Sequence, residues 1–238
     1  MRVCLANIDE AYALSCDLAE SWFQEASSFG EARKKSFLAG RALLQYLLRQ
    51  EDPACNLPKI SADERGKPIF KSRPDCHFNI SHSGTLIVVS VGHHENGIDI
   101  ERIKQRRQMD LLVQRVLSEG EKKILQTVEK GELFSKFFQL WTLRECLLKT
   151  SGRGLGGLDD IKIDLQKSTV FCPGVSCGCT WSMRTDDLPL KGMTLDSQPC
   201  YMTIYVPNGE KIDLCILHKL ELLSLHDIKP ESVFHINI

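Results

Sequence analysis

The chain has 238 residues, of which 42% are hydrophobic and 26% are charged. This composition is typical of a globular protein, and it excludes disordered, collagen-like and coiled-coil chains. The 30 Lys and Arg residues against 31 Asp and Glu residues give a net charge of −1, so the surface as a whole is not a general binder of nucleic acid. Any recognition of phosphate or of an acidic protein must therefore be local.

The N-terminal segment lacks a charged region followed by a long apolar run, so it does not resemble a secretory signal. No stretch approaches the roughly 18 apolar residues that span a bilayer. Ten cysteines without an export signal favour reduced thiols in a cytosolic protein over a disulfide framework. We therefore expect a cytoplasmic protein that does not associate with membranes.

The first half of the chain predicts a long helix followed by strands. Residues 31–50 place Phe and Leu side chains at helical spacing behind a basic start. Pro53 ends this helix, because the residue before a proline disfavours helical backbone. The β-rich stretch that follows predicts strands over 77–80, 86–91 and 97–101.

The second half predicts two helices and then a hairpin. Ser118 and Glu121 have the spacing of a capping box at a helix start, and a second helix is predicted over 132–152. Residues 201–217 form two alternating runs on either side of Asn208-Gly209, which predicts a β-hairpin. Helices and antiparallel strands in both halves predict an α+β fold, and we divide the chain into residues 1–105 and 106–238.

The segment from Gly97 to Glu101 has the pattern of a strand with two carboxylates on one face. Asp99 and Glu101 project to the same side, while Ile98 and Ile100 point to the other. Two neighbouring carboxylates repel each other unless a cation lies between them, and Mg²⁺ binds a few carboxylates together with substrate phosphates. The alternative is a half-exposed strand with a polar outer face.

On the second helix, Glu145 and Lys149 are an i, i+4 pair on the same face as Trp141. A glycine-rich exit follows, so this face could direct a carboxylate and an ammonium into a cleft. The alternative is a surface ion pair next to a core tryptophan.

The segment Ser81-His82-Ser83-Gly84 ends the strand predicted at 77–80, and its hydroxyls, imidazole and backbone N–H groups suit a pyrophosphate. A nucleophilic serine with a histidine base is the rival chemistry, but the G-x-S-x-G turn is absent. A polar turn is the structural alternative.

Two basic features are weaker signals of a ligand. The turn Gly66-Lys67-Pro68 could bring backbone and an ammonium against a ligand, or it could be an ordinary turn. Arg41 lies mid-helix among apolar residues, where a guanidinium needs a partner or a path to water.

Taken in chain order, these segments resemble the 4′-phosphopantetheinyl transferases of the larger, surfactin-synthetase-activator type. The order is Arg41, Gly66-Lys67-Pro68, Ser81-His82-Ser83-Gly84, the strand from Gly97 to Glu101, and then Glu145 and Lys149. The resemblance implies a pseudo-dimer of two similar halves, each an antiparallel sheet packed with helices, with coenzyme A in the cleft between them. It also implies a Mg²⁺-dependent reaction in which a serine of an apo acyl or peptidyl carrier protein attacks coenzyme A. The carrier receives the 4′-phosphopantetheine group, and adenosine 3′,5′-bisphosphate leaves.

The resemblance also implies roles for individual residues. The implied magnesium ligands are Asp99, Glu101 and Glu145. The implied contacts to coenzyme A are Arg41, Gly66, Lys67, Pro68, Ser81, His82 and Lys149. The implied catalytic residues are Glu145, as acceptor of the serine proton, and Lys149. The sequence departs from the family at Arg144, where a lysine is usual, so a planar fork replaces a point charge.

Carrier proteins of this family are generally acidic around the modified serine, and four cations directly follow the strand at 97–101. These cations are Arg102, Lys104, Arg106 and Arg107. They predict a docking surface for the carrier, whereas a solvated turn is the alternative. A fused pseudo-dimer completes its own cleft, so we expect a monomer.

Two other functions compete with transfer. One is a non-catalytic coenzyme A or carrier-binding relic, in which Arg144 marks lost chemistry. The other is a metal-dependent nucleotide phosphohydrolase, in which water is the acceptor and the basic segment has no purpose.

Overall fold

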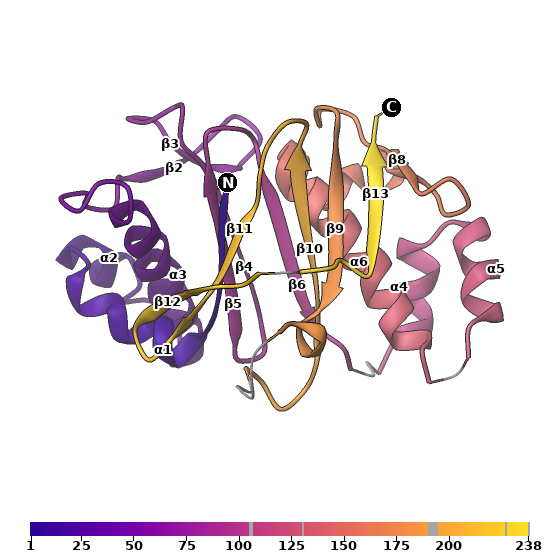
Figure 1. Ribbon diagram of the computed structural model, residues 1–238, viewed down its shortest axis with the longest axis horizontal. Coiled ribbons are helices and arrows are strands. Elements are labelled where there is room, and N and C mark those ends of the chain that lie inside the picture. Colours follow the sequence, from indigo (N-terminus) through magenta and orange to yellow (C-terminus); the bar gives the residue numbers. More distant parts are fainter. Residues whose placement is uncertain (105–106, 130, 190–194, 227, 238) are drawn as a thin grey trace.

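The computed structural model describes residues 1–238 except 105–106, 130, 190–194, 227 and 238. Within these ranges the protein is an α+β structure whose two large β-sheets lie next to each other, with helices on the flanks of the pair (Figure 1). The predicted fold class is therefore confirmed.

The first sheet packs one of its faces on a long helix. Its strands follow the order β12 (Glu221–Ser224), β11 (Asp213–His218), β1 (Arg2–Asn7), β5 (Leu86–Gly92) and β4 (His77–Ser83). In β1, Cys4 and Ala6 pack against α3 (Glu31–Arg49), whereas Val3 and Leu5 point to the opposite face. The remaining elements of this part are α1 (Ile8–Ala13), η1 (Leu14–Asp17), α2 (Glu20–Glu25), β2 (Ile60–Ala62) and β3 (Pro68–Phe70).

The second sheet packs in the same way on a second long helix, α6 (Leu133–Ser151). Its strands follow the order β6 (Gly97–Arg102), β10 (Cys200–Pro207), β9 (Gly178–Arg184), β13 (Ser232–Ile236), β8 (Thr169–Phe171) and β7 (Lys162–Asp164). The other elements are α4 (Met109–Val116), α5 (Glu119–Thr127), η2 (Leu155–Asp160) and η3 (Thr185–Asp187). The predicted capping box forms at the start of α5, between Ser118 and Glu121.

The two sheets repeat one arrangement of strands and helix. In each, the first strand (β1 or β6) is followed along the chain by a helix of 19 residues, then by two short strands (β2 and β3, or β7 and β8), and then by two longer strands (β4 and β5, or β9 and β10). The strand order is β1-β5-β4 in one sheet and β6-β10-β9 in the other, with antiparallel pairing throughout. This common topology is what two similar halves require. The faces that do not pack on helices share a core to which Leu5, Val88, Ile100 and Met202 belong.

The end of the chain is exchanged between the sheets, and this makes one sequence-based prediction wrong. No hairpin joins β10 to β11, because β10 pairs with β6 and β9 while β11 pairs with β1 and β12. The turn at Gly209 exists, but it leads from one sheet to the other. The predicted boundary falls on residues 105 and 106, which lie outside the described ranges, and each sheet takes strands from both sides of it.

None of the helices in the described part of the chain combines the length and the apolar character that crossing a bilayer demands. All ten cysteines carry free thiols.

Candidate functional site

The site forms where β4 and β6, each an edge strand of its sheet, lie side by side (Figure 1). A serine hydroxyl connects the two strands. Oγ of Ser81 donates to Oδ1 of Asp99 at 2.8 Å and accepts from the backbone N–H of Ile100 at 3.3 Å. The predicted alternation is confirmed, because Ile98 and Ile100 are buried in the shared core while Asp99 turns toward α6.

Helix α6 lies directly on β6 because Gly97 has no side chain. A Cβ at this position would collide with the side chain of Thr150 and with the carbonyl oxygen of Cys146. This close approach brings the Lys149 ammonium 2.6 Å from Oδ1 of Asp99 and 2.8 Å from Oγ of Ser81. The face predicted to carry Glu145 and Lys149 therefore does meet the carboxylate strand.

Three carboxyl groups share this part of the protein and influence one another. Burial raises the pKa of Asp99, which is 4% exposed, while Lys149 and Ser81 lower it. Burial also raises the pKa of Glu145 to about 7, and the charge of Asp99 contributes next. Glu101 raises the pKa of both groups further. The negative charges of Asp99 and Glu101 thus disfavour the ionised form of Glu145.

The donor set fits a divalent cation in its chemistry. Oδ2 of Asp99 is buried without a hydrogen-bond partner, and carboxylate oxygens are the ligands that Mg²⁺ prefers. Within the described ranges, no group of three or more His, Cys, Asp or Glu side chains is already arranged to hold an ion. The assignment of Asp99, Glu101 and Glu145 as ligands therefore stays a prediction.

A cleft of about 520 Å³ opens beside this acidic centre. Its walls come from α3, the β2–β3 hairpin, β4, α6 and the glycine-rich exit of α6. The predicted residues that line it are Arg41, Gly66, Lys67, Pro68, His82, Glu145 and Lys149. Residues that are distant in the sequence are thus brought together around one cavity.

Ser81 faces the acidic centre, and its implied contact to coenzyme A stays a prediction. It is 6% exposed and is not among the residues that line the cleft, whereas its neighbour His82 is. Successive side chains of a strand point to opposite faces, so the Ser81 hydroxyl faces Asp99 and Lys149 instead. Partial burial and the nearby Lys149 charge lower the pKa of His82, which favours a neutral imidazole.

The turn Gly66-Lys67-Pro68 lines the cleft and also caps α6. Nζ of Lys67 donates to the carbonyl oxygen of Thr150 at 2.6 Å, and Nη1 of Arg65 donates to that of Ser151 at 3.0 Å. The last carbonyls of a helix have no partner within the helix and attract cations. Burial lowers the pKa of Lys67, and the charges of Glu95 and Asp63 oppose this shift.

Arg41 finds its partners in aromatic rings. Its guanidinium carbon lies 3.4 Å from the ring centroid of Phe37 and 5.7 Å from that of Trp22, which is cation–π distance. Burial lowers the pKa of Arg41 to about 10, so the group stays charged at neutral pH. Its Nε is buried without a hydrogen-bond partner.

Two cations of the cleft, Arg33 and Arg65, were not predicted. Arg33 precedes Phe37 and Arg41 on α3 at intervals of four residues, so the three share one helix face. This spacing is the signal that could have identified Arg33. Arg65 comes directly before Gly66, but nothing in its local sequence distinguishes it from an ordinary turn residue.

Arg144 points away from the cleft. Its Nη2 lies 2.7 Å from both carboxylate oxygens of Glu121, and both residues are buried. Consecutive helix residues are about 100° apart around the axis, and Glu145 lines the cleft whereas Arg144 does not. Through Glu121, Arg144 holds α6 to the capping box at the start of α5.

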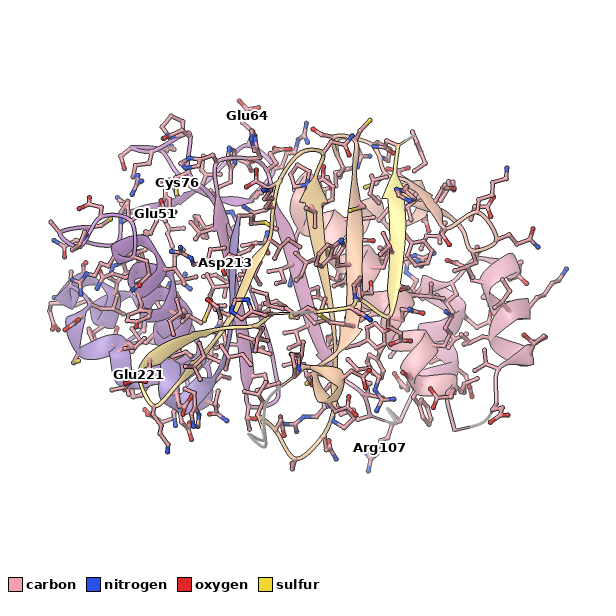
Figure 2. The ribbon with its side chains drawn as sticks, viewed as in Figure 1. Glu51, Glu64, Cys76, Arg107, Asp213 and Glu221 are labelled. Atoms are coloured by element: carbon pink, nitrogen blue, oxygen red, sulfur yellow. The ribbon has the colours of Figure 1, made fainter. Side chains whose placement is uncertain are left out.

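The described cations of the basic segment that begins at Arg102 differ in their contacts: one is paired within the fold and two are exposed. Nη2 of Arg102 pairs with Oδ2 of Asp196 at 2.6 Å, so this cation belongs to the fold. Lys104 and Arg107 are exposed, and Figure 2 shows Arg107 projecting from the edge of the molecule. Arg106 lies outside the described residues.

The comparisons with known proteins agree on one family. Residues 95–184 match the model of the 4′-phosphopantetheinyl transferase superfamily. The chain is 32% identical over 178 residues to the 4′-phosphopantetheinyl transferase Sfp of Bacillus subtilis (strain 168), an alignment that covers 73% of this chain and 67% of that protein. It is 36% identical over 121 residues to the 4′-phosphopantetheinyl transferase AcpT of Escherichia coli (strain K12), covering 50% and 59%. The 4′-phosphopantetheinyl transferase gsp of Aneurinibacillus migulanus is 33% identical over 126 residues, covering 51% and 49%.

Proposed function

Because the chain belongs to the 4′-phosphopantetheinyl transferase superfamily, we propose that it transfers the 4′-phosphopantetheine group from coenzyme A to a serine of an apo acyl or peptidyl carrier protein. The product that leaves is adenosine 3′,5′-bisphosphate. The observation that carries this proposal is the contact of Lys149 with Asp99 beside Glu145, at the wall of a cleft rich in cations. Phosphoryl transfer asks a protein mainly for positioning and charge neutralisation, and these groups offer both.

Coenzyme A occupies the 520 Å³ cleft in this proposal. Its pyrophosphate lies at His82 and Lys149, next to the carboxyl groups. Its adenosine and 3′-phosphate lie toward Arg41 and the turn Gly66-Lys67-Pro68. Arg33 and Arg65 line the same cleft and add to its positive charge.

Mg²⁺ is the metal in this proposal, and Asp99, Glu101 and Glu145 would hold it. When bound, it would neutralise charge on the pyrophosphate. The partnerless oxygen of Asp99 and the raised pKa of Glu145 support this assignment. A bound cation would give that oxygen a partner, and its positive charge would lower the pKa of Glu145.

Glu145 is also the proposed acceptor of the serine proton. A carboxylate that reaches the hydroxyl can act as its general base, and Glu145 lines the cleft next to Lys149. The serine oxygen forms a bond to the β-phosphorus of coenzyme A as its proton passes to the Glu145 carboxylate. The bond from this phosphorus to the bridging oxygen breaks, and the electron pair leaves with adenosine 3′,5′-bisphosphate. Lys149 and His82 hold the phosphate oxygens during this exchange.

The carrier docks at the exposed cations after β6, Lys104 and Arg107, in this proposal. Both are exposed in a segment that directly follows the strand with Asp99 and Glu101. An acidic carrier would be attracted to this place by complementary charge. We further propose that the protein is a monomer and that it works in the cytoplasm, where thiols such as its ten free cysteines stay reduced.

The test is to incubate the protein with coenzyme A, Mg²⁺ and an apo carrier protein, and then to weigh the carrier by mass spectrometry. We expect the carrier to gain one phosphopantetheine group and adenosine 3′,5′-bisphosphate to appear. A coenzyme A-binding relic would bind without changing the carrier mass. A nucleotide phosphohydrolase would consume its substrate equally well without any carrier.

A further inference from the structure

Two serines of β4 bind two carboxylates of β6 by the same pattern of hydrogen bonds. Ser81 donates to Asp99 and accepts from the next backbone N–H, that of Ile100. Ser83 donates to Oε2 of Glu101 at 2.8 Å and accepts from the backbone N–H of Arg102 at 2.9 Å. Each hydroxyl therefore takes the place of a carbonyl in a β-ladder and also fixes one carboxylate.

Ser83 has no other role in the site as described. It is half-buried and does not line the cleft, so it is not placed to bind coenzyme A. Its hydroxyl has one acceptor, a carboxylate oxygen of Glu101. A hydrogen bond from a neighbouring side chain restricts the rotation of a metal-binding carboxylate.

The turn that follows Ser83 is locked onto the end of β6. Oδ2 of Asp196 accepts from Oγ1 of Thr85 at 2.7 Å and from Nη2 of Arg102 at 2.6 Å, so it ties the turn to β6. Gly84 has a φ of +62°, and the Arg102 guanidinium lies where a Cβ of residue 84 would be. The position of Ser83 is thus fixed from both sides, by its strand and by the turn.

We infer that Ser83 is a positioning residue that orients the carboxylate of Glu101 for Mg²⁺, and that the Arg102–Asp196 pair keeps Ser83 in place. This inference rests on the proposed function, since it assumes that Glu101 is a metal ligand. It assigns the second serine of the Ser81-His82-Ser83-Gly84 segment to the metal side of the site. It also explains, without reference to any ligand, why residue 84 is a glycine.

The test uses Mn²⁺ as a probe of the full chain, because carboxylate sites that accept Mg²⁺ also accept Mn²⁺. Mn²⁺ affinity is measured by electron paramagnetic resonance in the parent, Ser83→Ala, Ser83→Cys and Ser83→Thr. Loss of an outer hydrogen bond to a metal ligand commonly costs 10- to 100-fold in metal affinity. We expect Ser83→Ala and Ser83→Cys to bind Mn²⁺ about 10-fold more weakly, and Ser83→Thr to lie close to the parent.

Ser232→Ala is the matched control. Ser232 is also a half-buried strand serine with one side-chain partner, Nε2 of Gln139 at 2.7 Å, but it lies on β13, far from β6 in the sheet order. Its removal should affect stability and not Mn²⁺ affinity. The KM for coenzyme A should stay within about twofold in all Ser83 variants, while the Mg²⁺ concentration for half-maximal rate rises with the loss of Mn²⁺ affinity.

The outcomes separate this inference from the proposed function. A parent protein that transfers phosphopantetheine and binds Mn²⁺, together with a Ser83→Ala variant of equal Mn²⁺ affinity, would overturn the role of Ser83 alone. If Ser83→Ala does not fold, equal affinity in Ser83→Cys would overturn it as well. A parent that neither binds Mn²⁺ nor modifies a carrier would overturn the proposed function and the inference with it.

Discussion

The ammonium of Lys149 lies 2.6 Å from a carboxylate oxygen of Asp99, and both side chains are largely withdrawn from water. Asp99 comes from a strand and Lys149 from the helix above it, so the pair joins β6 to α6 at the wall of the cleft. The sequence alone places these residues in separate motifs. In the structure they form a single electrostatic unit.

Lys149→Ala should weaken both the site and the fold. The buried carboxylate of Asp99 would lose its cation, and breaking such a pair by removing one partner commonly costs about 3–5 kcal/mol. Coenzyme A affinity and turnover should fall with it. Urea denaturation and a binding titration measure the two effects. The double variant with Asp99→Ala should be more stable than Lys149→Ala, and equal stability would show that the unpaired Asp99 carboxylate carries no penalty.

Gly97→Ala should separate α6 from β6. The added methyl group has no room beneath Thr150, and overpacking of this kind costs about 1–3 kcal/mol. Because the shift moves Glu145 and Lys149 away from Asp99, transfer should fall more than 10-fold, as a 1 Å displacement can cost about 100-fold. Gly120→Ala is the control, because a Cβ added at Gly120 would lie 4.0 Å from its nearest neighbour, Oγ of Ser118. Full activity in Gly97→Ala would contradict the close packing.

Glu145→Gln should change how the stability of the metal-free protein depends on pH. The folded-state pKa of Glu145 is about 7, above its ordinary value of 4.5, because of burial and then Asp99. Its contribution to stability is therefore complete below about pH 4.5 and is lost as the pH rises through 7. Relative to Glu145→Gln, the parent should lose stability between pH 5 and pH 8. Denaturation curves with a chelator present measure this, and parallel pH profiles would refute it.

Arg144→Lys should affect stability and leave the chemistry intact. Nη2 of Arg144 contacts both oxygens of Glu121 while Nη1 donates to the carbonyl oxygen of Leu140, and the single ammonium of lysine cannot reproduce both sets of contacts. A buried group left partly unsatisfied costs about 1–3 kcal/mol. The folded variant should bind coenzyme A as the parent does, because Arg144 is not in the cleft. A loss of coenzyme A affinity without a loss of stability would contradict this prediction and indicate that Arg144 acts in coenzyme A binding.

Lys104→Glu combined with Arg107→Glu should slow the encounter with an acidic carrier. Both side chains are exposed, so the apparent KM for the carrier should rise, and the effect should shrink as salt screens the charges beyond about 10 Å at 0.1 M. Coenzyme A affinity should not change. Unchanged carrier kinetics at low salt would place the docking surface elsewhere. Arg102 is excluded from this test because it pairs with Asp196.

The features that follow from local periodicity were predictable from the sequence. Strand alternation identified the shared face of Asp99 and Glu101, and helical spacing identified the common face of Glu145 and Lys149. The capping box at Ser118 is likewise a local motif. In each case the residues that decide the structure are within a few positions of one another, so their pattern is visible without the fold.

The partners of long-range contacts were not predictable. The segment after Asn208-Gly209 has the pattern of a hairpin strand, but it pairs in parallel with the free edge of β1 and not with β10. The buried partner of Arg144 is Glu121, 23 residues earlier in the sequence, and no local pattern links the two. Ser81 carried a role implied by the resemblance, and only the position of β6 beside β4 directs its hydroxyl to Asp99. These choices depend on which surfaces meet, and a single sequence does not encode that locally.

The exchange of β11 between the sheets has a consequence for synthesis on the ribosome. β1 is made first, but its parallel neighbour β11 begins at residue 213, after nearly all of the second sheet. Throughout most of translation β1 therefore presents unpaired backbone groups along one edge, and such an edge can pair with another chain. A nascent chain arrested before residue 213 would carry this hazard permanently. The first sheet can be completed only after β11 and β12, residues 213–224, have been synthesised.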